Sequence, residues 1–357
     1  MRLGSCVAVE LAVGVSLAAG LALAGTAGVR ELRGRWAHAG RAPAAPAERV
    51  EIRWPERPSL GPVRRALGLF RGVADDQLLA PLRTGEIDRV AFNLGGSSIS
   101  LRIDFDNGAR AAFKPRQTNW QTVPRREVAA YRINRLLGLS TVAPAIGRMF
   151  RVDDILSHLE PDSAYIAPRL RAEMIQNDGW VVGELSWWIP RIAKPRIDGY
   201  PVDSVDGVVT WHRYLTIGEP VPYREARLVA QISDMVVFDF LINNLDRWSG
   251  GNVRSSPDGS FLYYMDNTLS FGRQPAGAEK VRSYLMKVQK FSRSLVAALR
   301  ALDEEAVRAA LADDPGPFHE LLDDSEVAAL MARRDYALRY IDDLIARHGA
   351  DNVLVFP

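Results

Sequence analysis

Two acidic side chains in neighbouring loops are the strongest candidates for chemistry in this sequence. Asp246 shares one loop with Asn252, and Asp266 follows a short apolar stretch further along the chain. A carboxylate that orients or accepts a hydroxyl proton, beside an amide oxygen that holds a divalent ion, is the arrangement used in phosphoryl transfer. Asp266 can bind the same ions, because carboxylate oxygens are hard ligands. Taken singly, each of these loop residues is more often a turn or cap residue.

Three further features precede these loops in the order that phosphoryl transfer needs. Gly95 and Gly96 form a turn whose backbone N–H groups could cover phosphate groups, although such a turn alone is an ordinary hairpin signal. Lys114 ends an apolar strand, and Glu127, in the first turn of the next expected helix, is its natural carboxylate partner. Lys114 is one of five lysines among 45 basic residues, so a lysine at this strand end asks for a specific reason.

The composition excludes several classes of protein. The chain has 357 residues, of which 47% are hydrophobic and 25% charged, as in globular proteins with two domains or lobes. A net charge of +2 offers no electrostatic reason for nucleic-acid binding. With Cys6 as the only cysteine and five scattered histidines, neither an internal disulfide nor a Cys/His zinc site can form.

Hydrophobic patterning then predicts the elements that would position the first group of candidates. Residues 87–92 and 99–105 are typical of strands, the second with strict apolar/polar alternation. The residues 106–108, Asp-Asn-Gly, are a hairpin turn signal before a returning strand at 109–114. A helix is expected over 125–137. The pattern predicts an antiparallel meander followed by a helix.

The later part of the chain is expected to be mostly helical. Residues 223–242 carry a broad apolar face, 261–265 form a short strand, and a long helix covers 325–348. We therefore predict an α+β molecule with two lobes. The smaller, at 61–165, combines the antiparallel sheet with a helix, and the larger, at 166–357, is mainly helical.

The pattern of residues 1–24 predicts a segment that directs the protein to a membrane or out of the cell. The apolar run 11–23 ends in a small-residue motif, as in a cleaved secretory signal peptide. Glu10 before the run and arginines after it leave an uncleaved membrane anchor as the second interpretation. The Ala-, Arg- and Pro-rich residues 25–60 are typical of a linker. We expect an exported or membrane-anchored protein whose N-terminus could contact a membrane, with the cytoplasmic face still open.

Three segments resemble the secretory-pathway kinase family, which includes the Golgi casein kinase, the glycosaminoglycan xylose kinase and four-jointed. These segments are residues 112–148, 232–253 and 265–272, within a similarity that covers about 87–345. The chain is identified as a divergent, bacterial-like member. The resemblance implies an atypical protein-kinase-like fold, ATP as cosubstrate, and Mg²⁺ or Mn²⁺ as metal ion.

The same resemblance assigns roles residue by residue. Lys114 takes the place of the phosphate-contacting lysine, and Glu127 matches the acidic residue on the following helix. Asp246 matches the catalytic aspartate. Asp266 matches the metal-binding aspartate, with Asn252 as a further candidate ligand for the metal ion.

Departures from the family pattern leave two functions open. Trp248 and Ser249 stand where the family usually has histidine, and Ser100 lies near the place of a second lysine. Asn252 lies six residues after Asp246, one more than in ordinary protein kinases. We expect an ATP-dependent phosphotransferase that acts on a protein Ser/Thr or a sugar hydroxyl. The alternative is a pseudokinase that binds nucleotide or a partner without transfer, and a hydrolase ranks last because no G-x-S-x-G elbow is present.

Overall fold

The computed structural model describes residues 69–249 and 251–357. The expected signal or anchor at 1–24, the linker at 25–60 and residues 61–68 lie outside the described residues. Among the helices that are described, none is long and apolar enough to cross a membrane.

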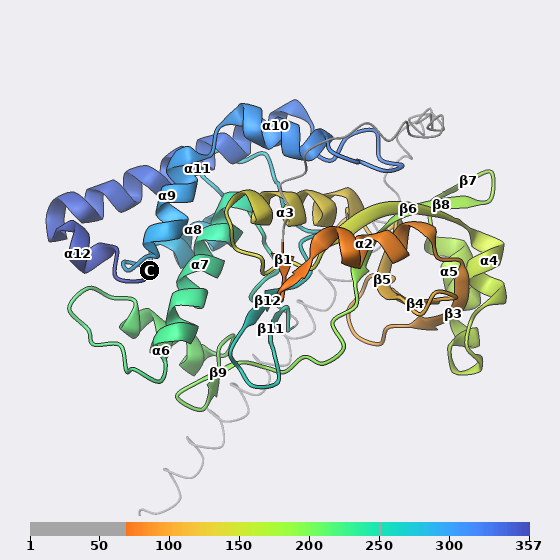
Figure 1. Ribbon diagram of the computed structural model, residues 1–357, viewed down its shortest axis with the longest axis horizontal. Coiled ribbons are helices and arrows are strands. Elements are labelled where there is room, and N and C mark those ends of the chain that lie inside the picture. Colours follow the sequence, from red (N-terminus) through yellow and green to blue (C-terminus); the bar gives the residue numbers. More distant parts are fainter. Residues whose placement is uncertain (1–68, 250) are drawn as a thin grey trace, which may run out of the picture. The chain divides into compact units, whose positions relative to one another are not determined.

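A six-stranded antiparallel sheet forms the core of the N-terminal lobe (Figure 1). Its strands are β3 (Ile87–Phe92), β4 (Leu101–Phe105), β5 (Arg110–Pro115), β6 (Ala145–Arg151), β7 (Gln176–Asn177) and β8 (Trp180–Trp187). They are ordered β3-β4-β5-β8-β6, with β7 paired to β8. The first three strands are the predicted meander, which is confirmed. Their alternation buries one face, including Leu101, Ile103 and Phe105.

The central strand β8 was not predicted from the sequence. The chain after residue 165 was expected to be mostly helical, yet β8 pairs with both β5 and β6. Residues 181–185 are all buried, so the strand lacks the apolar/polar alternation that marks a half-exposed strand. The expected lobe division near residue 165 therefore does not coincide with the end of the sheet, which continues to Trp187.

Helix α3 (Pro124–Leu136) packs against β6 and β8. It begins with a proline, whose missing N–H costs nothing in the first turn, and Gly138 follows its end with a positive φ of 68°. Other small elements complete this lobe: the hairpin β1 (Leu69–Phe70) and β2 (Val73–Ala74), helices α2 (Asp75–Thr84), α4 (Val152–Ser157) and α5 (Ala167–Glu173), and a 3₁₀ turn (Pro161–Ile166).

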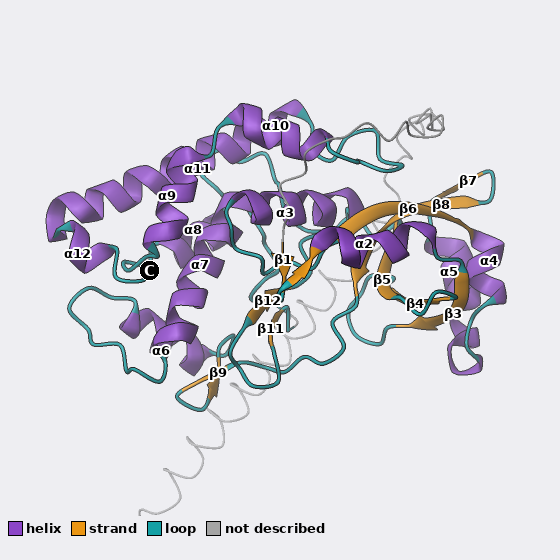
Figure 2. Ribbon diagram, viewed as in Figure 1, coloured by secondary structure: helices purple, strands orange, loops and turns teal. Residues whose placement is uncertain are grey.

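The C-terminal lobe is mainly helical, as predicted (Figure 2). Its helices are α6 (Val205–Tyr214), α7 (Ala226–Ile242), α8 (Glu279–Leu285), α9 (Arg293–Ala301), α10 (Glu304–Ala312), α11 (Asp324–His348) and α12 (Ala350–Val353). Two short antiparallel ladders accompany them, β9 (Arg196–Ile197) with β10 (Tyr200–Pro201) and β11 (Val253–Ser255) with β12 (Leu262–Tyr264). Helix α7 is buried along most of its length and ends at Asn243 in the left-handed conformation.

The long C-terminal helices return to the N-terminal lobe. Helix α10 packs on α3 and lies above it in Figure 1. At the start of α11, Asp323 and Glu326 form a reciprocal capping box. The Glu326 carboxylate also receives Arg125 and Arg126 from α3, each at 2.7 Å. Helix α3 is therefore held by both lobes.

Candidate active site

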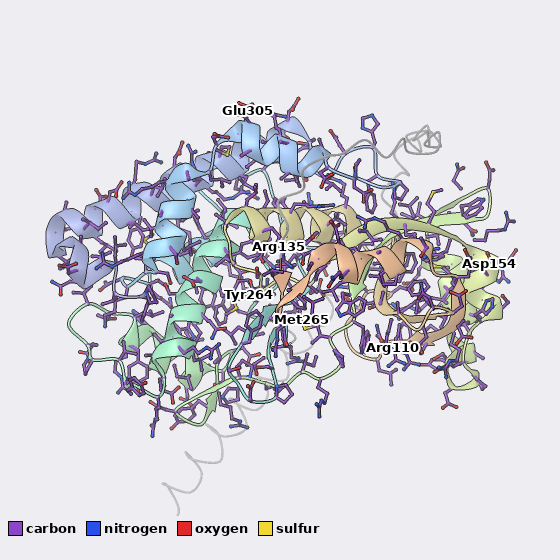
Figure 3. The ribbon with its side chains drawn as sticks, in the orientation of Figure 1. Arg110, Arg135, Asp154, Tyr264, Met265 and Glu305 are labelled. Atoms are coloured by element: carbon purple, nitrogen blue, oxygen red, sulfur yellow. The ribbon has the colours of Figure 1, made fainter. Side chains whose placement is uncertain are left out.

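Lys114 and Asp266 meet between the lobes. The Lys114 Nζ lies 2.6 Å from Asp266 Oδ1, and the two side chains are 12% and 30% exposed. Lys114 belongs to β5 in the sheet of the N-terminal lobe. Asp266 follows Tyr264, the last residue of β12, and Met265, both of which Figure 3 labels. Burial alone would raise the pKa of Asp266, but the ammonium of Lys114 lowers it below its ordinary value. Burial likewise opposes the charge on Lys114, but the carboxylates of Asp266 and Glu127 raise its pKa.

The glycine turn leaves the sheet at the same end as Lys114. In the strand register Leu101 lies opposite both Phe92 and Phe113, so residues 93–100 extend beyond the strand ends next to Lys114. Gly95 and Gly96 have φ values of 115° and 89°, a conformation that suits glycine, and a Cβ atom added at either would meet no other atom within 4 Å.

Gln117 anchors this turn, and sequence analysis did not single it out. The backbone N–H of Ile99 donates to Gln117 Oε1 at 2.7 Å, and Gln117 Nε2 donates back to the Ile99 carbonyl at 3.0 Å. Gln117 is buried. The sequence offers no signal for this pairing, because a lone glutamine after a strand is ordinary.

Glu127 lies at the site but hydrogen-bonds elsewhere than expected. Asp266 is the carboxylate within ion-pair distance of Lys114, while Glu127 acts on that ammonium through its charge. Both Glu127 oxygens accept from Asn267, at 2.5 Å from the backbone N–H and 2.8 Å from Nδ2. Burial raises the pKa of Glu127, against the opposing effect of Lys114.

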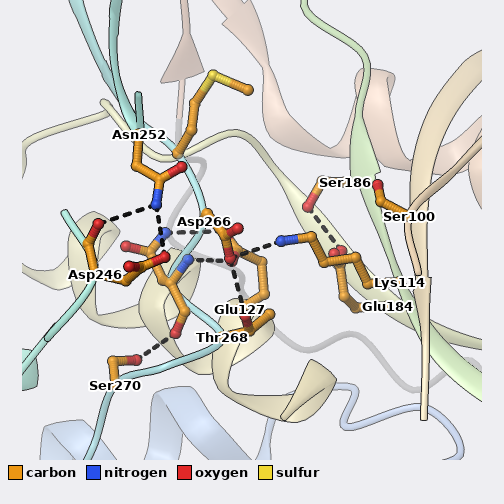
Figure 4. A network of polar contacts seen from close by, with 12 residues as sticks. Ser100, Lys114, Glu127, Glu184, Ser186, Asp246, Asn252, Asp266, Thr268 and Ser270 are labelled. Carbon is orange, nitrogen blue, oxygen red and sulfur yellow. Dashed lines mark hydrogen bonds and ion pairs between the residues drawn. The ribbon is translucent and has the colours of Figure 1, made fainter. Parts of the chain in front are cut away.

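A third carboxyl group beside Lys114, that of Glu184, was missed. It lies directly across from Lys114 in the β5–β8 register and is 2% exposed. Ser186 Oγ donates to Glu184 Oε2 at 2.7 Å, and Ser100 lies close by in Figure 4. Burial and the charge of Glu127 raise the pKa of Glu184 well above its ordinary value. The available sequence signal was a single acidic residue within a mostly apolar stretch of eight residues.

The Asp246 loop is held in shape by amide side chains. Asp246 N–H donates to Asn244 Oδ1 at 2.9 Å, and Asn252 Nδ2 donates to Asp246 Oδ2 at 2.9 Å. The amide oxygen of Asn252 points away from Asp246 (Figure 4). Burial and the neighbouring charge of Asp266 raise the pKa of Asp246, against the hydrogen bond from Asn252.

Two residues next to Asp246 are built into the protein interior. Arg247 is fully buried and paired with Asp239 on α7 at 3.1 Å. Trp248 stacks on Tyr284 with ring centroids 4.6 Å apart. Trp211 lies 5.5 Å from the same indole. Trp248 therefore packs the Asp246 loop against α6 and α8.

The donor set suits a divalent ion bound together with a phosphate ligand. Within residues 69–249 and 251–357, no three His, Cys, Asp or Glu side chains gather as a metal-binding group. Magnesium is usually held by one or two carboxylates plus substrate phosphates rather than by a protein cage. Asp266 and the outward amide oxygen of Asn252 provide such a partial set. Asp266, Glu127 and Glu184 lie around the ammonium of Lys114 and raise its pKa.

The two lobes and the residues between them define a protein-kinase-like molecule. The family model Fam20C, described as "Golgi casein kinase, C-terminal, Fam20", matches residues 211–353. Mouse pseudokinase FAM20A is 23% identical over 309 residues, which cover 72% of this chain and 56% of that protein. Human extracellular serine/threonine protein kinase FAM20C is 23% identical over 382 residues, covering 89% of this chain and 63% of that protein. Zebrafish glycosaminoglycan xylosylkinase is 20% identical, covering 78% of this chain.

Solved structures agree with this fold. A crystal structure of the Golgi casein kinase has a TM-score of 0.63 at 18% identity and covers 78% of this chain and 77% of that one. A structure of that kinase with Mn/ADP bound has a TM-score of 0.62 and covers 78% of each chain. The family model thus matches residues 211–353, and the solved structures share the fold of this chain. It spans little more than half the length of the FAM20A relative that it matches.

Proposed function

We propose that this chain is an ATP-dependent phosphotransferase that transfers the γ-phosphoryl group to a hydroxyl. The observation that carries the proposal is the ion pair of Lys114 and Asp266, 2.6 Å apart between the lobes, with Asp246 within electrostatic reach. Phosphoryl transfer needs an ammonium for phosphates, a carboxylate for metal and a carboxylate for the acceptor hydroxyl. These three residues meet that requirement.

The nucleotide would lie between the lobes. In this proposal Lys114 contacts its phosphates, and the open N–H groups of Gly95 and Gly96 cover them. Asp266 and Asn252 would hold Mg²⁺ or Mn²⁺, which when bound neutralises charge on the phosphates during transfer. A solved structure with a similar fold, that of the Golgi casein kinase, carries Mn/ADP, which supports this choice of ligands.

Asp246 would orient the acceptor hydroxyl and accept its proton. Its pKa lies above the ordinary value because of burial, which makes the carboxylate a stronger base. The hydrogen bond from Asn252 to Oδ2 helps to fix the plane of the carboxylate. The acceptor class is a protein Ser/Thr or a sugar hydroxyl, in line with the kinase and xylosylkinase names of the relatives.

The decisive experiment is transfer from labelled ATP by the purified full chain with Mg²⁺ or Mn²⁺, against a protein panel and a sugar panel. Asp246→Asn preserves the size of the side chain and should abolish transfer while leaving nucleotide binding intact. Asp258→Asn, at an exposed turn carboxylate, is the matched control and should remain active. Equal turnover in the wild type and in Asp246→Asn would refute the assignment.

The second candidate is a pseudokinase that binds nucleotide without transfer. Two observations favour it: Trp248 is committed to packing on Tyr284, and Ser100 rather than a lysine lies beside Glu184. One relative is itself named a pseudokinase. Nucleotide binding by the wild type without turnover on either panel would support it. Turnover that is lost in Asp266→Asn would exclude it.

We also propose that the protein acts after export. Residues 1–24 have the pattern of a signal or anchor, and the human relative is described as extracellular. Fractionation of expressing cells, with mass spectrometry of the mature N-terminus, would distinguish cleavage near residue 24 from an uncleaved anchor. Protein that stays in the cytoplasmic fraction would contradict this proposal.

A further inference from the structure

Asn267 is hydrogen-bonded to both lobes at once. Its side chain is fully buried. Toward the N-terminal lobe, Nδ2 donates to Glu127 Oε1 at 2.8 Å and the backbone N–H donates to Oε2 at 2.5 Å. Toward the C-terminal lobe, Oδ1 accepts from Arg247 Nη2 at 2.6 Å and from Asn244 Nδ2 at 3.2 Å. One amide group therefore connects residues that lie 140 positions and 20 positions away in the chain.

Arg247 continues this connection into the core of the C-terminal lobe. Its Nε donates to both oxygens of Asp239 at 3.1 Å, and its Nη1 donates to the carbonyl of Met265. Asp239 belongs to α7, the buried helix of that lobe, and is itself 2% exposed. The full sequence of contacts therefore runs from α3 through Glu127, Asn267 and Arg247 to α7.

The polarity of these contacts requires an amide at position 267. Glu127 as a carboxylate can only accept, and Arg247 can only donate, so the residue between them must donate on one side and accept on the other. Aspartate would bring a second carboxylate against Glu127. An apolar residue would leave a buried carboxylate and a buried guanidinium short of partners, which is costly.

We propose that Asn267 is a positioning residue that holds Glu127, and with it helix α3, in the active site. The relay of Glu127, Asn267 and Arg247 couples the two lobes next to Asp266, whose ion pair with Lys114 is one residue away along the chain. The role of the relay in catalysis rests on the proposed function. Its role in holding α3 does not, and can be measured on its own.

The test exchanges donor and acceptor across the contact. Asn267→Asp places a carboxylate oxygen against the carboxylate of Glu127. Glu127→Gln places an N–H₂ group against one of the two N–H donors of Asn267. In the double variant the new glutamine can donate to the new aspartate, and the net charge equals that of the wild type. The readouts are the Tm of the full chain at pH 8 and amide hydrogen exchange of residues 124–136. We expect both single variants to lower the Tm and the protection of α3.

The double variant should then recover part of the loss. Recovery is partial because Asn267 Nδ2 also donates to the Tyr264 carbonyl at 3.0 Å, which aspartate cannot do. A double variant that is less stable than Asn267→Asp, or whose effects simply add, would overturn the relay. The matched control is Asn134→Asp. Asn134 is also a fully buried asparagine, but it lies on α3 and contacts Thr141 rather than Glu127. Combined with Glu127→Gln, this control should show additive losses.

Failure to fold would not leave the question open. If Asn267→Asp alone is unfolded, a folded double variant carries the same conclusion. If both are unfolded, Asn267→Ala and Glu127→Ala replace them, and the double truncation should cost less than the sum of the single ones.

Measurements of turnover distinguish a failure of the relay from a failure of the proposed function. Asn267→Asp should lower kcat/KM for ATP by about 10–100-fold at a temperature where it is folded, as for other residues that orient a ligand-binding carboxylate. The double variant should stay impaired, because it lacks the Glu127 carboxylate. A wild type without turnover would count against the phosphotransferase, while the stability cycle still decides the relay.

Discussion

At the scale of single residues, the site concentrates carboxyl groups around one ammonium. Burial lowers the pKa of Lys114, whereas Asp266, Glu127 and Glu184 raise it, with Asp266 having the largest effect of the three. Opposite charge at short range lowers the cost of keeping each buried carboxylate ionised. Lys114 is therefore the internal cation of the site, and its removal should matter to folding as well as to nucleotide binding.

Lys114→Met should lower the stability of the protein in the absence of metal. Removing one partner of a buried pair leaves the other charge uncompensated, and since Asp266 is 30% exposed we expect a loss of about 2 kcal/mol. Mn²⁺ should raise the Tm of this variant more than that of the wild type, because a divalent ion can replace the ammonium beside Asp266. Thermal unfolding with and without Mn²⁺ measures both effects. Lys287→Met, at a lysine bonded to a helix carbonyl, is the control, and an equal response to Mn²⁺ in all three chains would contradict the prediction.

At the scale of elements, helix α3 is fixed at its N-terminal end by the start of α11. Glu326 is 1% exposed and receives guanidinium groups from Arg125 and Arg126, which are 24% and 20% exposed. The same carboxylate accepts from the backbone N–H of Asp323 in the capping box. One side chain thus starts a helix of the C-terminal lobe and anchors the helix that carries Glu127.

Glu326→Gln should destabilise the protein by about 2 kcal/mol, because it leaves two partly buried cations without their carboxylate. Gln can still accept from Asp323, so the capping hydrogen bond survives and the loss reports the ion pairs. Denaturant unfolding measures the difference. The control is Glu304→Gln, whose exposed pair with Arg308 within α10 should be worth at most about 0.5 kcal/mol. Equal losses in the two variants would refute the anchoring role of Glu326.

The same residue predicts a pH dependence. Burial alone would raise the pKa of Glu326, but Arg125 and Arg126 lower it below the ordinary value of 4.5. A lowered folded-state pKa stabilises the protein above the unfolded-state pKa, and this contribution is lost as the pH falls through the lower folded-state value. The stability difference between the wild type and Glu326→Gln should therefore be full at neutral pH and shrink below pH 4.5. Denaturant unfolding of both chains across that range tests the sign, and a difference that grows in acid would contradict it.

At the scale of the whole molecule, the described residues share one large apolar core that runs through both lobes. A second, smaller cluster joins the N-terminal hairpin to β12, where Phe70 and Tyr263 have ring centroids 6.0 Å apart. Arg71 Nη1 also donates to the Tyr263 hydroxyl at 2.7 Å. Contacts of this kind make the lobes parts of one folding unit rather than separate domains.

The two lobes should accordingly unfold in a single cooperative transition. Far-UV and near-UV circular dichroism should report the same midpoint, and the calorimetric and van't Hoff enthalpies should agree. Phe70→Ala, which removes one ring of the smaller cluster, should lower that midpoint without splitting the transition. Two resolved transitions in the wild type would contradict the prediction.

Much of the local structure could be read from the sequence because it depends on near neighbours. The alternation at 101–105, the hairpin turn at 106–108 and the proline-led start of α3 are patterns that a few adjacent residues specify. The order of Lys114 before Asp246 and Asp266 could also be read directly from the sequence. A buried strand such as β8 lacks the alternation, so its place in the sheet needed its partners β5 and β6.

By itself, the sequence determined which chemical groups the site contains and in what order, whereas the tertiary structure decided their partners. It brought Lys114 to Asp266, turned Glu127 toward Asn267, and added Glu184 and Arg247, which local patterns did not reveal. The physical reason is that these contacts join residues far apart in the chain. They depend on strand register and on how the two lobes pack, and neither is encoded in the spacing of neighbouring residues.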